Sequence, residues 1–131
     1  AIQQFCEFIS RNKSIDIYFD NRNFSLIKSS IEMTILYQTV KELINNTIKH
    51  SHAQKIRIEL KNQNNQIILY YRDDGQGFNL DEKLVENTGL GLNNIINKIK
   101  TLKGNCDFNS VEGKGMFVLI SINLDENHKY I

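Results

Sequence analysis

The chain has 131 residues, of which 40% are hydrophobic and 24% are charged, and its formal net charge is +1. This length suits one compact domain with its own core and is too short for two. The balance of 16 basic and 15 acidic residues gives no electrostatic reason to expect a nucleic-acid or membrane partner.

No apolar stretch approaches the roughly 20 residues needed to span a bilayer, and no signal peptide opens the chain. The two cysteines are too few to hold a domain together by disulfides, which favours a reducing compartment. We therefore expect a cytoplasmic domain. A longer parent protein anchored in the inner membrane stays open, because the chain begins with Ala1 instead of Met.

Apolar residues spaced for a helix face, or alternating as in a strand, predict the elements of the chain. In chain order these are a helix over 1–10, a strand over 14–20, an extended piece over 24–30, a helix over 31–50, strands over 55–61 and 66–72, a helix over 92–103, and strands over 105–110 and 116–124. Residues 62–65 and 112–115 fit hairpin connections, Gly104 fits a helix end, and 125–131 fit a flexible tail.

About five strands and three helices, with antiparallel hairpins at two places, predict a single α+β domain over residues 1–131. We expect a two-layer α/β sandwich, in which the helices cover one face of a mixed, mostly antiparallel sheet.

The long helix over 31–50 carries a polar stripe opposite its apolar side. Glu42 and Asn46 lie one turn apart, and Lys49 and His50 continue the same line. An amide oxygen suits Mg²⁺, a lysine suits phosphate charge, and a carboxylate can orient or deprotonate a nucleophile. The alternative is that the stripe is the solvated face of an ordinary amphipathic helix.

Glycine-rich turns add three further features. Asp73 and Asp74 follow an apolar strand and precede Gly75 and Gly77, so an acid emerges where the backbone can approach a ligand. Asp73 continues the face of Leu69 and Tyr71, which favours it over Asp74 as the ligand-facing acid. The other features are the sequence Gly89-Leu90-Gly91-Leu92, which opens a helix whose amino end suits phosphates, and the hairpin pair Gly113 and Gly115.

The familiar phosphate loop and the dinucleotide-binding glycine motif are both absent from the sequence. The ordered segments KELINNTIKHSHA, DDGQGF, TGLGLNNI and EGKGM instead resemble the Bergerat-fold, or GHKL, ATPase superfamily. Within it they are most similar to the catalytic and ATP-binding domain of sensor histidine kinases. The resemblance covers roughly residues 1–124.

The resemblance implies a role for each matching residue. Asn46 would coordinate Mg²⁺, Glu42 would orient or deprotonate the nucleophile, and Lys49, with His50, would lie near the phosphates of ATP. Asp73 would accept a hydrogen bond from the adenine amine in a pocket shaped by the neighbouring glycines. Gly75 and Gly77 would shape the adenine pocket, and Gly113 and Gly115 would form the third glycine box. Gly89 and Gly91 would form the hinge and phosphate-facing end of the ATP lid over 78–91, with Leu90 and Leu92 beside them as further ligand-binding positions.

Two positions depart from the family pattern. Met116 stands where the family usually has a small hydroxyl residue or alanine, and Phe78 is the only aromatic residue between the first two glycine loops. His50 and His52 could form a metal pair, but no third ligand is apparent. Cys106 fits a core position in its strand.

The resemblance implies transfer of the γ-phosphoryl group of ATP to a histidine on dimerisation helices upstream of residue 1, for relay to a response regulator. The parent would be a homodimer and the isolated domain a monomer. An anti-sigma-factor-like serine kinase and a non-catalytic ATP-binding module are the alternatives.

Overall fold

In a computed structural model of the protein, the structure describes residues 2–25, 31–50, 52–76 and 92–124. The helices are α1 (Ile2–Asn12), α2 (Ile31–His50) and α4 (Leu92–Thr101). The strands are β1 (Asp16–Asp20), β2 (Lys55–Gln63), β3 (Gln66–Asp73), β4 (Asn105–Val111) and β5 (Gly115–Asn123). No described helix is both long enough and apolar enough to cross a bilayer.

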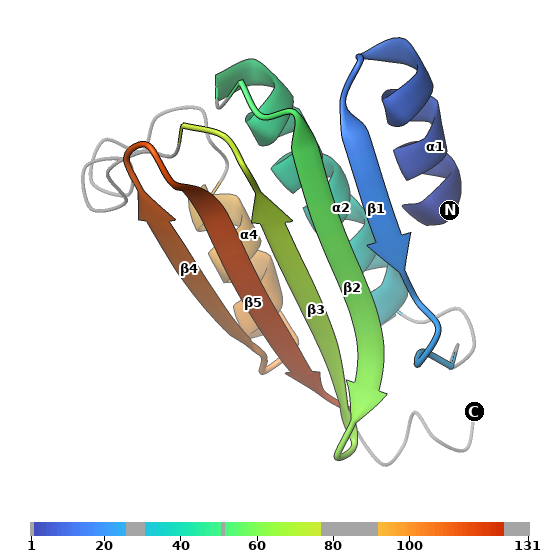
Figure 1. Ribbon diagram of the computed structural model, residues 1–131. Helices are drawn as coiled ribbons and strands as arrows, with labels where there is room; N and C mark the ends of the chain where they lie inside the picture. Colours follow the sequence, from blue (N-terminus) through green and yellow to red (C-terminus); the bar gives the residue numbers. More distant parts are fainter. Residues whose placement is uncertain (1, 26–30, 51, 77–91, 125–131) are drawn as a thin grey trace.

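The five described strands form one sheet in the order β1-β2-β3-β5-β4. β1 runs parallel to β2, and every other neighbouring pair is antiparallel. Helices α2 and α4 lie behind this sheet, with α1 beside α2 at the β1 edge (Figure 1). The predicted α+β sandwich with a mixed, mostly antiparallel sheet is confirmed.

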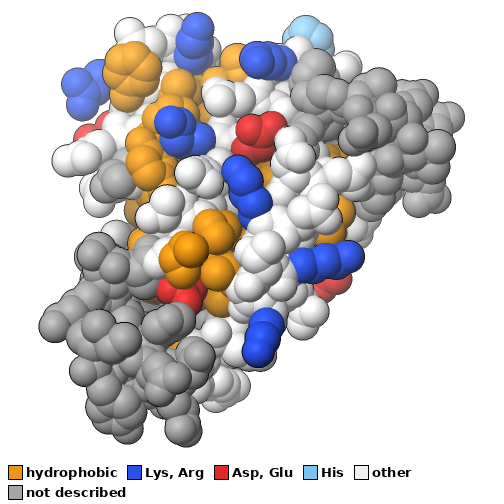
Figure 2. Space-filling model, turned by 180° about the vertical axis from the view of Figure 1, so that it is seen from behind, with side chains coloured by type: hydrophobic (Ala, Val, Ile, Leu, Met, Phe, Trp, Pro, Cys, Tyr) orange, Lys and Arg blue, Asp and Glu red, His pale blue; other side chains and the backbone are white. Residues whose placement is uncertain are grey.

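The core lies between the sheet and α2. The apolar side of α2 is fully buried at Leu36, Val40, Leu43 and Ile44, and it faces strand residues that alternate between buried and partly exposed positions. Burying one such side chain stabilises the fold by about 1.5–3 kcal/mol. Seen from the helix side, apolar side chains reach the surface in separate patches between lysines and arginines (Figure 2). The exposed sheet face carries none of the described helices.

The β2–β3 hairpin is tighter than the predicted connection over 62–65. Both strands continue further, and only Asn64 and Asn65 form the turn, with φ of 51° and 62°. Asparagine tolerates this left-handed backbone, and two consecutive positive φ angles match the twist of a two-residue hairpin.

The end of α4 is also shorter than predicted. The helix ends at Thr101, and Lys103, not Gly104, adopts the left-handed conformation with φ of 56°. The Gly104 amide donates to the Ile99 carbonyl at 3.0 Å, which closes the helix end. A Cβ at Gly104 would lie 2.7 Å from the Ser121 carbonyl oxygen, so close packing against β5 requires glycine there. The other predicted helix and strand boundaries differ by at most two residues. Most of the predicted extended piece over 24–30, and the whole of the predicted tail over 125–131, lie outside the described residues.

Candidate functional site

The carboxylate of Asp73 lies at the carboxyl end of β3 and turns toward the helix layer. Asp73 is only 2% exposed. Leu69 and Tyr71, on the same face of β3, are buried with it, as the alternation of side chains along a strand predicted. One carboxylate oxygen, Oδ1, accepts hydrogen bonds from the Gly75 amide at 2.9 Å and the Met116 amide at 3.2 Å. The backbone therefore fixes this acid in place.

Asp74 points elsewhere. It is exposed, and its Oδ1 accepts from the amides of Gln54 and Lys55, both at 2.9 Å. These bonds fasten the end of β3 to the start of β2. Of the two adjacent acids, only Asp73 faces α2.

Thr47 connects Asp73 to α2, and the sequence did not identify this role. Its hydroxyl donates to Asp73 Oδ2 at 2.9 Å and is also hydrogen-bonded to the Tyr71 hydroxyl. All three side chains are buried, and burial raises the pKa of Tyr71 well above its ordinary value, so the phenol keeps its proton. The only signal for Thr47 was a hydroxyl residue placed on the apolar side of the helix.

Replacing Thr47 with Val tests this connection. Thr47→Val leaves Asp73 Oδ2 and the Tyr71 hydroxyl without their shared partner, so we expect a loss of about 1–3 kcal/mol in the free energy of unfolding. Thr39→Val is the matched control, because the equally buried Thr39 hydroxyl donates only to the Ile35 carbonyl of its own helix. Urea denaturation of both variants measures the difference, and equal losses would contradict the role of Thr47.

The hairpin before β5 closes the site from the other side. Gly113 and Gly115 have φ of 83° and 88°, and the Gly113 amide donates to the Gln76 carbonyl. A Cβ at Gly115 would lie 2.2 Å from the Asp73 carbonyl oxygen. The first and third glycine boxes are thus in direct contact around Asp73. Met116, the departure from the family pattern, contributes here through its backbone amide while its side chain is buried.

The polar stripe of α2 lies at the same end of the molecule. Asn46 directly precedes Thr47, which donates a hydrogen bond to Asp73. Asn46 itself is buried, with 7% of its surface exposed. Glu42, one turn earlier, is half-buried, and Lys49 is exposed at the end of the helix. The interpretation of this stripe as a wholly solvated face is therefore wrong at Asn46.

The remaining predicted site residues lie at the ends of helices or outside the described ranges. Leu92 is the buried first residue of α4. His50 ends α2, but the structure does not describe its side chain. The positions that lie outside the described residues are Gly77, Gly89, Leu90 and Gly91.

The remaining reactive side chains are not part of this site. His52 is exposed just after α2, and no three His, Cys, Asp or Glu side chains in the described ranges cluster as metal ligands do. Burial raises the pKa of Cys6 to about 11 and of Cys106 to about 12. Both thiols therefore stay protonated at neutral pH, and Cys106 is half-buried against the core as predicted.

A fixed acid beside glycine turns, facing a polar helix across a mixed sheet, is the arrangement expected of the ATP-binding domain that the sequence resembles. The chain belongs to the histidine kinase-, DNA gyrase B- and HSP90-like ATPase family, whose model matches residues 32–126. The predicted resemblance to a histidine-kinase ATP-binding domain is confirmed, and the family implies ATP binding.

Its relatives include two sensor kinases. The chain is 35% identical over 89 residues to the sensor histidine kinase ComP of Bacillus subtilis, covering 68% of this chain and 12% of that protein. It is 44% identical over 55 residues to the sensor protein VraS of Staphylococcus haemolyticus, covering 42% of this chain and 16% of that protein. The chain thus spans only a small part of these relatives.

Solved structures share the fold. The histidine kinase domain of the blue-light activated histidine kinase EL346 of Erythrobacter litoralis aligns with a TM-score of 0.77 at 16% identity, covering 97% of this chain and 61% of that one. The catalytic domain of the histidine kinase ThkA aligns with a TM-score of 0.71 at 18% identity, covering 97% and 92%.

Proposed function

We propose that this chain is the catalytic and ATP-binding domain of a two-component sensor histidine kinase. It transfers the γ-phosphoryl group of Mg-ATP to a histidine on dimerisation helices of the parent protein, and a response regulator receives it. The relatives named as sensor kinases support this proposal, together with one structural observation. That observation is the buried carboxylate of Asp73, fixed by three donors beside two glycine turns.

Hydrogen-bond counting shows what Asp73 can bind. A carboxylate has two oxygens with about four acceptor sites in total. Oδ1 uses both of its sites on the amides of Gly75 and Met116, and Oδ2 uses one on Thr47. The described residues leave one site on Oδ2, which suits a single additional donor such as the exocyclic amine of adenine.

The residues of α2 fit the phosphate end of the same ligand. Asn46 offers an amide oxygen of the kind Mg²⁺ accepts, and Lys49 is an exposed cation near the end of the helix. Bound Mg²⁺ would neutralise charge on the transferred phosphoryl group. Glu42 would orient the attacking imidazole or hold its proton. The parent would be a homodimer whose catalytic domains work where cytoplasmic ATP is available, whether or not it is anchored in a membrane.

Asp73→Asn tests the nucleotide site. Asparagine turns an amide donor toward one of the two Oδ positions, so we expect the affinity for ADP and Mg-ATP to fall by about 10- to 100-fold. Asp74→Asn is the matched control, because that neighbouring acid is exposed and accepts from the amides of Gln54 and Lys55 at the start of β2. Calorimetric titration measures both variants. If the wild-type and Asp73→Asn chains bind ADP and Mg-ATP with equal affinity, Asp73 does not recognise adenine.

The identity of the product separates the kinase classes. In a protein that carries the dimerisation helices, we expect the phosphorylated product to be labile in acid and stable in base, as phosphohistidine is. An acid-stable product would instead identify a serine kinase. ATP binding without any transfer would identify a regulatory module.

A further inference from the structure

The sheet face opposite the helices carries a row of side chains that the proposed ATP site does not use. The strand register places Tyr18, Arg57, Arg72 and Phe117 opposite one another on β1, β2, β3 and β5. Residues directly opposite each other point to the same side of a sheet. Arg72 directly precedes the helix-facing Asp73, so it points to the open face. The row therefore crosses four strands on the side without described helices (Figure 1).

Two hollows lie over this row. One, of about 380 Å³, has Tyr18, Arg57 and Arg72 in its lining, together with Lys55 and Lys114. The other, of about 330 Å³, is lined by Arg72, Lys114 and Phe117. Four cations line the first hollow together with three acidic residues, Asp16, Asp73 and Asp74. The Asp73 carboxylate is bonded to Thr47 on the helix side, and Asp74 already accepts two backbone amides. The face is therefore electropositive at its centre.

The two arginines of the row occupy an unfavourable arrangement. Arg57 and Arg72 are direct cross-strand partners, and like charges in such positions repel each other. Within the described part of the chain, the Arg72 guanidinium has no hydrogen bond or ion pair. A negatively charged group above both arginines would remove the repulsion. Guanidinium groups also match carboxylates with paired hydrogen bonds.

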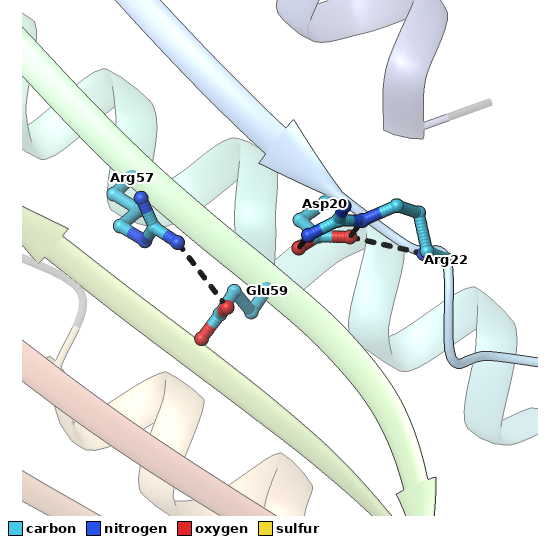
Figure 3. A network of polar contacts seen from close by, with 4 residues as sticks. All are labelled: Asp20, Arg22, Arg57 and Glu59. Carbon is cyan, nitrogen blue, oxygen red and sulfur yellow. Dashed lines mark hydrogen bonds and ion pairs between the residues drawn. The ribbon is translucent and has the colours of Figure 1, made fainter.

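The contacts around Arg57 and Arg72 leave both side chains able to bind a ligand. Arg57 lies 3.4 Å from Glu59 in a pair whose side chains are 53% and 36% exposed, and Arg22 is paired with Asp20 on β1 (Figure 3). Such an exposed pair is weak enough to be exchanged for a ligand. The Arg57 guanidinium also lies 4.8 Å from the centre of the Tyr18 ring, which holds it over the sheet. At the other end of the row, Phe117 packs edge-on against Tyr70.

We propose that this open face docks an extended acidic segment of a partner protein. Its carboxylates bind Arg57 and Arg72, and its apolar side chains contact Tyr18 and Phe117. Three strand spacings separate the ends of the row, or about 14 Å, which an extended segment covers with about four or five residues. A second copy of this chain fits less well, because a two-fold interface would place the same cations against themselves.

Peptide binding to the 131-residue chain tests the proposal. The probe is a fluorescein-labelled peptide in which glutamates alternate with tyrosine and leucine, and the control peptide has glutamine at each glutamate position. Fluorescence anisotropy should show binding of the acidic peptide that weakens with added salt, as expected for exposed charges. Arg72→Ala should weaken it by about tenfold, and loss of both arginines should abolish it.

Arg11→Ala is the matched control, because it removes the same charge from exposed α1 on the other side of the sheet. It should leave peptide binding unchanged, and Arg72→Ala should leave ADP binding unchanged, so this test does not depend on the proposed kinase function. The proposal would be overturned by no binding to the wild type, equal binding of the glutamine peptide, equal binding to Arg72→Ala, or displacement by inorganic phosphate at concentrations as low as those of the peptide. The last would assign the face to small anions. A dimer that Arg72→Ala disrupts would instead assign it to self-association.

Discussion

Replacement of Gly115 by Ala is expected to destabilise the domain by about 3 kcal/mol and to abolish nucleotide binding. A side chain at φ of 88° costs about 1–2 kcal/mol in backbone strain. The added Cβ would also lie 2.2 Å from the Asp73 carbonyl oxygen and 3.3 Å from Asp73 Oδ1. Backbone atoms cannot rotate away as a side chain can, so either the hairpin or the end of β3 must shift.

Gly113→Ala separates strain from this steric conflict. Gly113 has a similar φ of 83°, but a Cβ there would have no atom within 4 Å among the described residues. We expect it to cost only the strain, about 1–2 kcal/mol. Urea denaturation gives both free energies of unfolding, and titration with ADP gives the affinity. If the two alanine variants lose equal stability, the contact between Gly115 and Asp73 does not constrain the site.

Periodicity predicted the elements because each one buries a single face. The alternation of Ile15, Ile17 and Phe19 and the shared face of Leu69, Tyr71 and Asp73 both follow from this simple geometry. The same reasoning selected Asp73 over Asp74, and the structure places only Asp73 against α2. Local pattern is sufficient wherever burial alone decides the direction of a side chain.

The rest of the site depends on contacts between distant segments. Thr47 and Asp73 are 26 positions apart, and nothing in the sequence shows which turn of α2 meets the end of β3. The Met116 amide is 43 positions from Asp73 and leaves no side-chain signal, since any residue except proline supplies an N–H. The resemblance to a known family located this hairpin, whereas physical reasoning from the residues alone described it only as a turn.

Turn geometry was predicted less well than strand position for a related reason. Gly104 was predicted to end the helix, but the left-handed residue after α4 is Lys103, and Gly104 is required by the proximity of β5. A glycine gives the same signal for a positive φ and for a close tertiary contact. Only the three-dimensional structure separates these two causes.

Glu42→Gln is expected to leave ATP binding intact and to reduce phosphoryl transfer by about 10²- to 10⁴-fold, the range for loss of a positioned acid–base group. Glutamine has nearly the same volume as glutamate and still forms hydrogen bonds, so this half-buried position of α2 should keep its packing. The variant loses only the negative charge and the basicity. Removal of Asp73 should instead weaken binding itself, and the two substitutions thereby distinguish recognition from chemistry.

The measurement requires a protein that includes the dimerisation helices, because transfer needs the acceptor histidine. Rates of phosphohistidine formation at saturating Mg-ATP isolate the chemical step from affinity. Glu59→Gln is the control, since it removes the same charge from the open face of the sheet, where it contacts Arg57. A Glu42→Gln protein that binds ATP normally and transfers at the wild-type rate would show that the acceptor imidazole needs no base from α2. Catalysis would then depend on positioning and on charge neutralisation around the phosphates alone.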